Sequence, residues 1–223
     1  NAVIDAVAQC GLHVVIFGAR GGGKSSLANI IKPLLEVMAP GTTPLVVRIN
    51  ANLQDSFSSV WAKAMDEISF ENEQPVFGFT RAIAKDRVSL RQAFGVSDLP
   101  SIDEVRRTLA RLPNSVFVID EFDRLPKRFV SQFTDLIKVL SDMAVDSTVI
   151  LVGVADSLDG LVKDHSSIPR ALVQVHMPRM NTSELKEILL KAGEALGMKF
   201  EDDASSRVAR MSQGLPHYTH LVG

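Results

Sequence analysis

The sequence predicts an α/β fold with a mainly parallel, five-stranded sheet, because short apolar runs alternate with amphipathic helical patterns along most of the chain. The length of 223 residues is enough for a domain with a sizeable core. After Pro178 the strand patterns stop and only helical patterns follow. We therefore expect a core over residues 1–180 and the start of a small all-helical unit, truncated in this chain, over residues 181–223.

Five apolar runs are the strand candidates, and each is followed by a turn or by a helical pattern. They are residues 13–17, 44–50, 115–120, 148–154 and 171–177. Helical patterns occupy residues 24–38, 56–69, 101–112, 130–144, 181–197 and 202–214. Residues 71–100 contain scattered Pro and Gly with weak periodicity, and we interpret them as an insertion or a loop with a short helix.

The composition argues against several functional classes. The net charge is −2 and the basic residues near positions 81–91 and 106–111 are interspersed with acids, which is typical of a solvated surface rather than a nucleic-acid-binding one. A single cysteine, Cys10, cannot form an internal disulfide. Since no apolar run approaches the roughly 20 residues that span a bilayer, we expect a cytoplasmic protein without a membrane partner.

The segment GARGGGKS, residues 18–25, fits the phosphate-loop pattern G-x-x-x-x-G-K-[ST] between a strand and a helix. Glycines leave room for backbone N–H groups to converge on phosphate oxygens, and the helix N-terminus also favours the anion. Lys24 is expected to reach the β- and γ-phosphates of ATP or ADP, and the Ser25 hydroxyl to bind Mg²⁺. The expected nucleotide-binding residues here are Gly18, Ala19, Arg20, Gly21, Gly22, Gly23, Lys24, Ser25 and Ser26.

Two acids end the apolar run FVIDEFDRL, residues 117–125. Ligands of open α/β sheets lie at the carboxyl ends of the strands, so these acids should face the phosphates. Asp120 suits a water-mediated contact with Mg²⁺, and Glu121 is placed to orient or deprotonate the attacking water. Asp123 and Arg124 are interpreted as caps of the next helix.

Together these motifs resemble those of the AAA+ ATPases, closer to their initiator (origin-recognition) and STAND-like branches than to protein-unfolding machines. The resemblance covers nearly the whole chain and implies the three-layer αβα sandwich of P-loop NTPases with a helical lid. The segment VGVADSLDGL is similar to the sensor 1 strand of the initiator ATPases, which usually carries Asn where this chain has Asp156. Asp156 and its neighbour Ser157 are therefore the sensor 1 candidates.

The same resemblance points to two further site elements. Arg170 stands where AAA+ proteins carry an arginine finger, which acts in trans on the nucleotide of a neighbouring subunit; Arg179 is the reserve candidate. The segment QGLPHY is similar to the GxP element of STAND NTPases, in which the proline lies near the bound base. Pro216 is thus a nucleotide-binding candidate, and His217 occupies the place of the lid's sensor 2 arginine.

These features support three functional hypotheses. The leading one is an ATPase module that uses Mg-ATP to drive homo-oligomer assembly or a conformational switch. The first alternative is a STAND-type signalling switch that hydrolyses ATP slowly, and the second is an initiator-like loader or remodeller that binds DNA. Since helical patterns run to both ends of the chain, we expect the native protein to continue past Gly223 and to contact a DNA or protein partner through those further regions.

Overall fold

The computed structural model describes residues 2–38, 44–75, 83–154 and 170–223, with only the backbone of residues 71–75 and 83–86. Its main sheet has five strands in the order β2-β5-β6-β1-β7, and all neighbouring strands are parallel. The strands are β1 (His13–Gly18), β2 (Leu45–Asn50), β5 (Ser115–Asp120), β6 (Ser147–Gly153) and β7 (Leu172–Met177). The predicted α/β fold with a five-stranded parallel sheet is confirmed.

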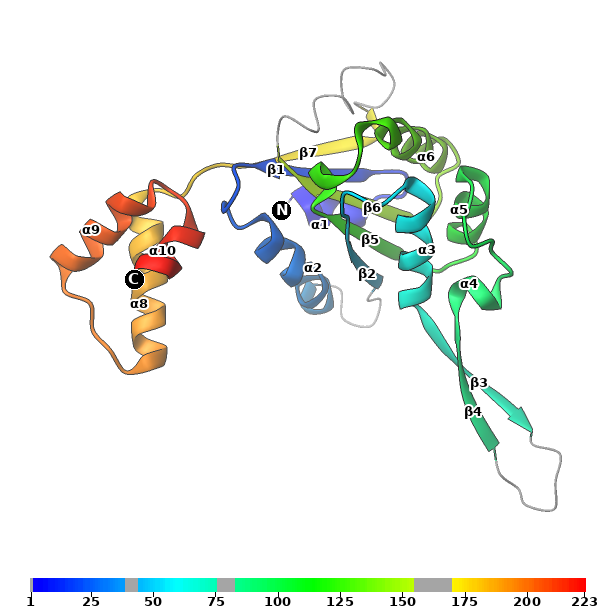
Figure 1. The fold of residues 1–223 in the computed structure, drawn as a ribbon, viewed down its shortest axis with the longest axis horizontal. Helices are drawn as coiled ribbons and strands as arrows, with labels where there is room; N and C mark the ends of the chain where they lie inside the picture. Colours follow the sequence, from blue (N-terminus) through cyan, green and yellow to red (C-terminus); the bar gives the residue numbers. More distant parts are fainter. Residues whose placement is uncertain (1, 39–43, 76–82, 155–169) are drawn as a thin grey trace.

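Helices cover both faces of the sheet, because the side chains of each strand alternate between two apolar layers (Figure 1). On β1, Val14 and Ile16 pack with the helices of one face, whereas Val15 packs with those of the other. The first face carries α1 (Ala2–Val7) and α2 (Lys24–Met38). The second carries α3 (Phe57–Glu67), α5 (Ile102–Leu109) and α6 (Val130–Asp142). This is the expected three-layer αβα sandwich.

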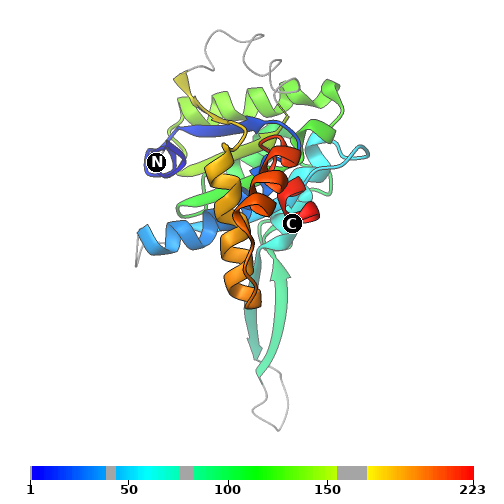
Figure 2. The ribbon, with the colours of Figure 1, turned by 90° about the vertical axis from the view of Figure 1, so that its left-hand side faces the viewer.

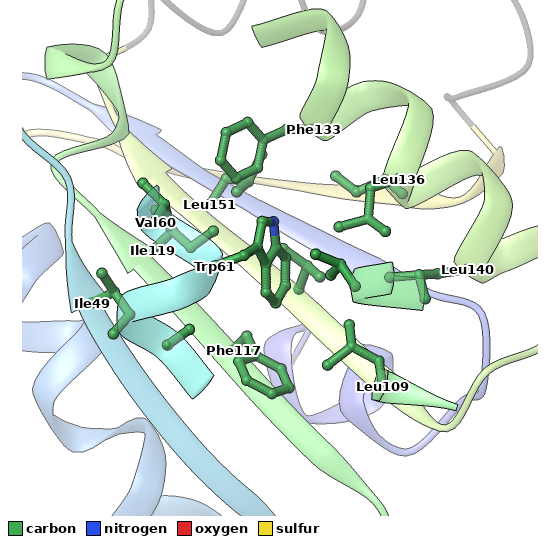
Figure 3. Packing of buried hydrophobic residues seen from close by; sticks show 14 of the residues in the cluster. Ile49, Val60, Trp61, Leu109, Phe117, Ile119, Phe133, Leu136, Leu140 and Leu151 are labelled. Atoms are coloured by element: carbon green, nitrogen blue, oxygen red, sulfur yellow. The ribbon is translucent and has the colours of Figure 1, made fainter. Parts of the chain in front are cut away.

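The larger apolar layer is organised around Trp61 of α3, which is fully buried (Figure 3). Its ring lies 5.3 Å from that of Phe117 on β5, and Phe57 lies 5.0 Å from Phe133 on α6. Aromatic contacts at these distances add to the free energy gained by burying the rings. This packing fixes α3 and α6 against β5, the strand that carries the acidic motif at its end.

A β-hairpin, β3 (Ser69–Pro75) paired antiparallel with β4 (Ile83–Ser89), follows α3. In both views it projects away from the sheet (Figures 1 and 2), and the short helix α4 (Leu90–Ala93) leads back to the core. The interpretation of this region as an insertion or a loop with a short helix missed the two strands, whereas the short helix is present as α4. A two-stranded ribbon outside the core buries little surface, so its sequence does not need the apolar alternation that marks a strand.

Three helices follow the last strand: α8 (Thr182–Leu196), α9 (Asp202–Ser212) and α10 (Pro216–Val222). They pack on one another beside the sheet (Figures 1 and 2), and we call them the lid. A capping box at Asn181 begins α8, and Gly197 ends it with φ 68°. The domain boundary near residue 180 stays a prediction. In the described ranges, no helix combines the length and the apolar character that crossing a bilayer requires.

His13 at the start of β1 makes the stability of the fold depend on pH. Its Nδ1 accepts a hydrogen bond of 3.0 Å from the backbone N–H of Val149, and burial lowers the pKa of His13 from 6.5 to about 4. The unfolded chain therefore binds the proton more tightly than the folded chain. We expect this contribution to the free energy of unfolding to be complete above pH 6.5 and to be lost as the pH falls to about 4, at a total cost of about 3 kcal/mol.

Urea denaturation at several pH values measures this dependence. His13→Gln keeps an acceptor for Val149 but removes the titration, so the fall between pH 6.5 and 4 should become shallower. The matched control is His176→Gln, which replaces an exposed histidine on β7 and should leave the wild-type slope. An unchanged slope in His13→Gln would show that the acid sensitivity comes from other groups.

Candidate functional site

The loop between β1 and α2, residues 19–23, which we call the glycine loop, has a backbone suited to binding an anion. Gly21 and Gly23 have φ angles of 74° and 88°, which residues with a Cβ rarely adopt. A Cβ at Gly18 would overlap the carbonyl oxygen of Met177 on the neighbouring strand β7. Since α2 begins at Lys24, the N–H groups of its first turn have no partner within the helix and point toward the loop. This backbone can hold phosphate oxygens.

Lys24 lies over the same loop. Its Nζ donates hydrogen bonds of 3.0 Å to the oxygen of Gly18 and 2.8 Å to that of Ala19. Burial lowers the pKa of Lys24, while the charges of Asp123 and Asp120 oppose that shift and the charge of Arg20 adds to it. A lysine that hydrogen-bonds to the glycine loop and interacts with the charges of two carboxylates is placed to bind a phosphate.

The acidic end of β5 lies at the same edge of the sheet. Strand β6 separates β5 from β1, and all three strands are parallel, so Asp120 and the loop after Gly18 emerge at one edge. Asp120 is buried, at 2% exposure, and its Oδ1 accepts a 2.8 Å hydrogen bond from the backbone N–H of Glu121. Glu121 has a left-handed conformation, with φ 55° and ψ 31°. This bend directs the chain away from the sheet immediately after Asp120.

Each acid of this segment is paired with an arginine from a different position. Nη2 of Arg48 lies 2.7 Å from Oδ2 of Asp120, and Nη1 of Arg124 lies 3.3 Å from Oε2 of Glu121. Nη2 of Arg20, on the glycine loop, lies 3.6 Å from Oδ2 of Asp123. Asp123 and Arg124 lie within the 3-10 helix η1 (Phe122–Arg124). Their interpretation as caps of the next helix was wrong, because the N-cap of α6 is Phe129 and has no side-chain cap.

Arg48 was not predicted from the sequence. The signal was present in β2, where one basic residue interrupts the apolar run LVVRIN and alternates with the buried Val47 and Ile49. That alternation places Arg48 on the α2 face of the sheet. Arg48 stays exposed at the edge of the sheet, and the buried carboxylate of Asp120 is the group that needs a partner there.

A cleft of about 940 Å³ extends from the glycine loop to the lid. Its walls include Lys24 and Glu121 on the core side and Pro216 and His217 at the start of α10. The backbone N–H of His217 donates a 3.4 Å hydrogen bond to the oxygen of Gly21, so the lid contacts the loop directly. In Figure 1 the carboxyl end of β1 faces the lid helices. The cleft brings together the loop, the acidic segment and the lid candidates.

The remaining candidates lie elsewhere. Asp156 and Ser157 fall outside the described residues. Arg170 is exposed and directly precedes β7, so it lies at the amino edge of the parallel sheet, opposite the glycine loop. Nη1 of Arg179 donates a 3.2 Å hydrogen bond to the oxygen of Gln213, at the turn that leads into α10. Arg179 therefore contacts the lid, whereas Arg170 does not line the cleft.

The sequence model of the family described as novel STAND NTPase 1 matches residues 1–218, almost the whole chain. The chain belongs to this family. The STAND NTPase is also 23% identical, over 94% of its length, to the Holliday junction branch migration complex subunit RuvB of Staphylococcus aureus. It spans about half the length of that relative, 51%.

Solved structures share the fold of the STAND NTPase at low identity. The Walker-type ATPase of Pyrococcus abyssi has a TM-score of 0.62 at 15% identity and covers 98% of this chain and 63% of its own. The Aeropyrum pernix ORC1 protein, solved in complex with DNA, has a TM-score of 0.61 at 16% identity, covering 98% and 56%. A Thermotoga maritima RuvB variant has a TM-score of 0.52 at 19% identity, covering 93% and 52%. The family match thus confirms the STAND-like P-loop NTPase expected from the sequence, and these structures share its fold.

Proposed function

We propose that this chain is an ATP-binding and ATP-hydrolysing module that uses Mg-ATP to drive oligomer assembly or a conformational switch. The observation that carries the proposal is the shared cleft, which Lys24, Glu121 and His217 line from three different elements. Its volume of about 940 Å³ is within the range of pockets for cofactor-sized ligands. The position of the cleft between sheet and lid would let nucleotide binding change the position of the lid.

The residues of the cleft, together with Asp120 at the end of β5, fit the chemistry of a nucleotide with magnesium. The glycine loop and the first turn of α2 supply N–H donors for the phosphates, and Lys24 supplies a positive charge. Ser25, exposed at the start of α2, and the carboxylate of Asp120 would hold Mg²⁺, the latter through water. The metal ion would neutralise charge on the phosphates during hydrolysis. Glu121, half-buried at the rim of the cleft, would orient the attacking water and accept its proton.

A slow-hydrolysing STAND-type switch is the second candidate function. The ion pair between Glu121 and Arg124 supports it, because this pair would have to open before the carboxylate could contact an attacking water. A single-turnover experiment, with protein in excess over ATP, separates the two functions. A fast module converts the bound ATP within seconds, whereas a switch retains it for minutes. If ATP is neither bound nor converted, both functions are contradicted.

The arginines of α4 and α5 give weak support to a DNA-binding role. Arg91 contacts the carboxylate of Asp66, and Arg106 and Arg107 both contact that of Asp103. Arginines whose charge is balanced by neighbouring acids contribute little to binding a phosphate backbone. These arginines therefore give little support to a DNA-binding role for this chain.

We further propose that Arg170 acts in trans on a neighbouring copy. A strand of this length separates the two edges of the sheet by roughly 20 Å, so Arg170 cannot reach its own glycine loop. Mixing Arg170→Ala with Lys24→Ala subunits should restore part of the hydrolysis that each variant lacks alone, because mixed contacts contain one intact loop and one intact arginine. An enzyme that keeps full activity per subunit on dilution to monomers would contradict the proposal.

A further inference from the structure

The guanidinium of Arg48 links the phosphate-loop helix to the acidic strand end. Its Nη2 donates to Oδ2 of Asp120, at 2.7 Å, and its Nη1 donates to Oδ1 of Asn29 on α2. The side chain of Asp120 is 3% exposed and that of Arg48 is 33% exposed. Strand β2 is at the edge of the sheet (Figure 1), so Arg48 reaches inward from the border of the core.

The pair with Arg48 compensates the charge of a buried carboxylate. A carboxylate as buried as that of Asp120 is costly unless a positive charge and hydrogen bonds compensate it. One of its oxygens accepts from the backbone N–H of Glu121, and the other accepts from Arg48. Arg48 therefore supplies the charge that a divalent cation would otherwise bring to Asp120.

We propose that Arg48 is a positioning residue that stands in for the divalent cation at Asp120 before Mg-nucleotide binds and competes with that cation afterwards. This inference rests on the proposed function, because it concerns Asp120, the carboxylate proposed to hold Mg²⁺ through water. One carboxylate then serves two positive groups, which repel each other across a partly buried site. Arg48 thereby weakens the dependence of nucleotide binding on Mg²⁺, and keeps Asp120 oriented when no cation is bound to it.

Replacing Arg48 by Met tests both parts of this role. Without nucleotide, the variant should melt about 4 to 8 °C below the wild type, because Asp120 loses its counter-charge. The second readout is the ratio of ATP affinity in Mg²⁺ to ATP affinity in EDTA, measured with a fluorescent ATP analogue. This ratio should rise at least tenfold, because Mg²⁺ no longer competes with a guanidinium for Asp120. Loss of packing alone would lower both affinities and leave the ratio unchanged.

Two further variants complete the test. Arg48→Lys keeps a positive charge, so its ratio should stay within a factor of about three of the wild-type value. Arg107→Met removes an equal charge from the exposed face of α5 and should change neither readout. A ratio in Arg48→Met equal to or below the wild-type ratio overturns the inference while the proposed function stands. Failure of the folded wild type to bind ATP at all overturns the proposed function, and the inference with it.

Discussion

Replacing Glu121 by Gln should slow ATP hydrolysis at least a hundredfold while ATP binding stays close to that of the wild type. The amide has the same shape but cannot accept a proton, and general-base assistance contributes about 10²–10⁴ in rate. The backbone N–H of residue 121, which donates to Asp120, is unaffected by the change. Single-turnover ADP formation and equilibrium ATP binding, measured on the same preparation, check the two halves of the expectation.

Glu187→Gln is the matched control for this exchange. Glu187 is exposed on α8, where it pairs with Lys191, so the same loss of charge should leave hydrolysis unchanged. If turnover in Glu121→Gln falls less than tenfold, Glu121 is not the group that activates water. The acid that remains nearby, Asp123, would then be the first to test, although its pair with Arg20 turns it toward the glycine loop.

Lys24→Ala should remove most ATP binding without unfolding the protein. The hydrogen bonds of Lys24 go to the backbone of its own loop, at Gly18 and Ala19, so its removal should cost little packing. Two charge-assisted hydrogen bonds to phosphate contribute about 3 kcal/mol together, which corresponds to about a hundredfold loss of affinity. The measurement is a titration with ATP and Mg²⁺, accompanied by the melting temperature of the variant.

Lys32→Ala provides the control, because Lys32 is an exposed lysine on the same helix, away from the loop. Its affinity for ATP should equal that of the wild type. Retention of wild-type affinity by folded Lys24→Ala would contradict the assignment of residues 18–25 as the phosphate loop.

The sequence predicted the sheet and the glycine loop well because both depend on local patterns. A buried parallel strand such as 115–120 must be apolar throughout, and a phosphate cradle needs glycines such as Gly21 and Gly23 at fixed positions. The helix starts were equally readable: Ser101 and Glu104 form the capping box that the pattern indicates. These are the parts of the chain in which neighbouring residues alone determine the conformation.

Contacts between distant segments could not be predicted in the same way. The pairing of Arg48 with Asp120 depends on β2 lying next to β5, a strand order that the sequence does not state. The contact between His217 and Gly21 likewise depends on where the lid packs. The resemblance to STAND NTPases predicted that Pro216 and His217 lie near the nucleotide. The arginines that pair with Asp120 and Asp123, which are Arg48 and Arg20, can be identified only from the three-dimensional structure.

The measurement that tests the central claim most directly is a calorimetric titration of the wild-type chain with ATP in the presence of Mg²⁺. The cleft between the glycine loop and the lid predicts saturable binding at one site per chain, and Mg²⁺ omission should weaken it. Absence of ATP binding by a preparation that melts cooperatively, at ATP concentrations in the millimolar range where weak sites fill, would contradict the account.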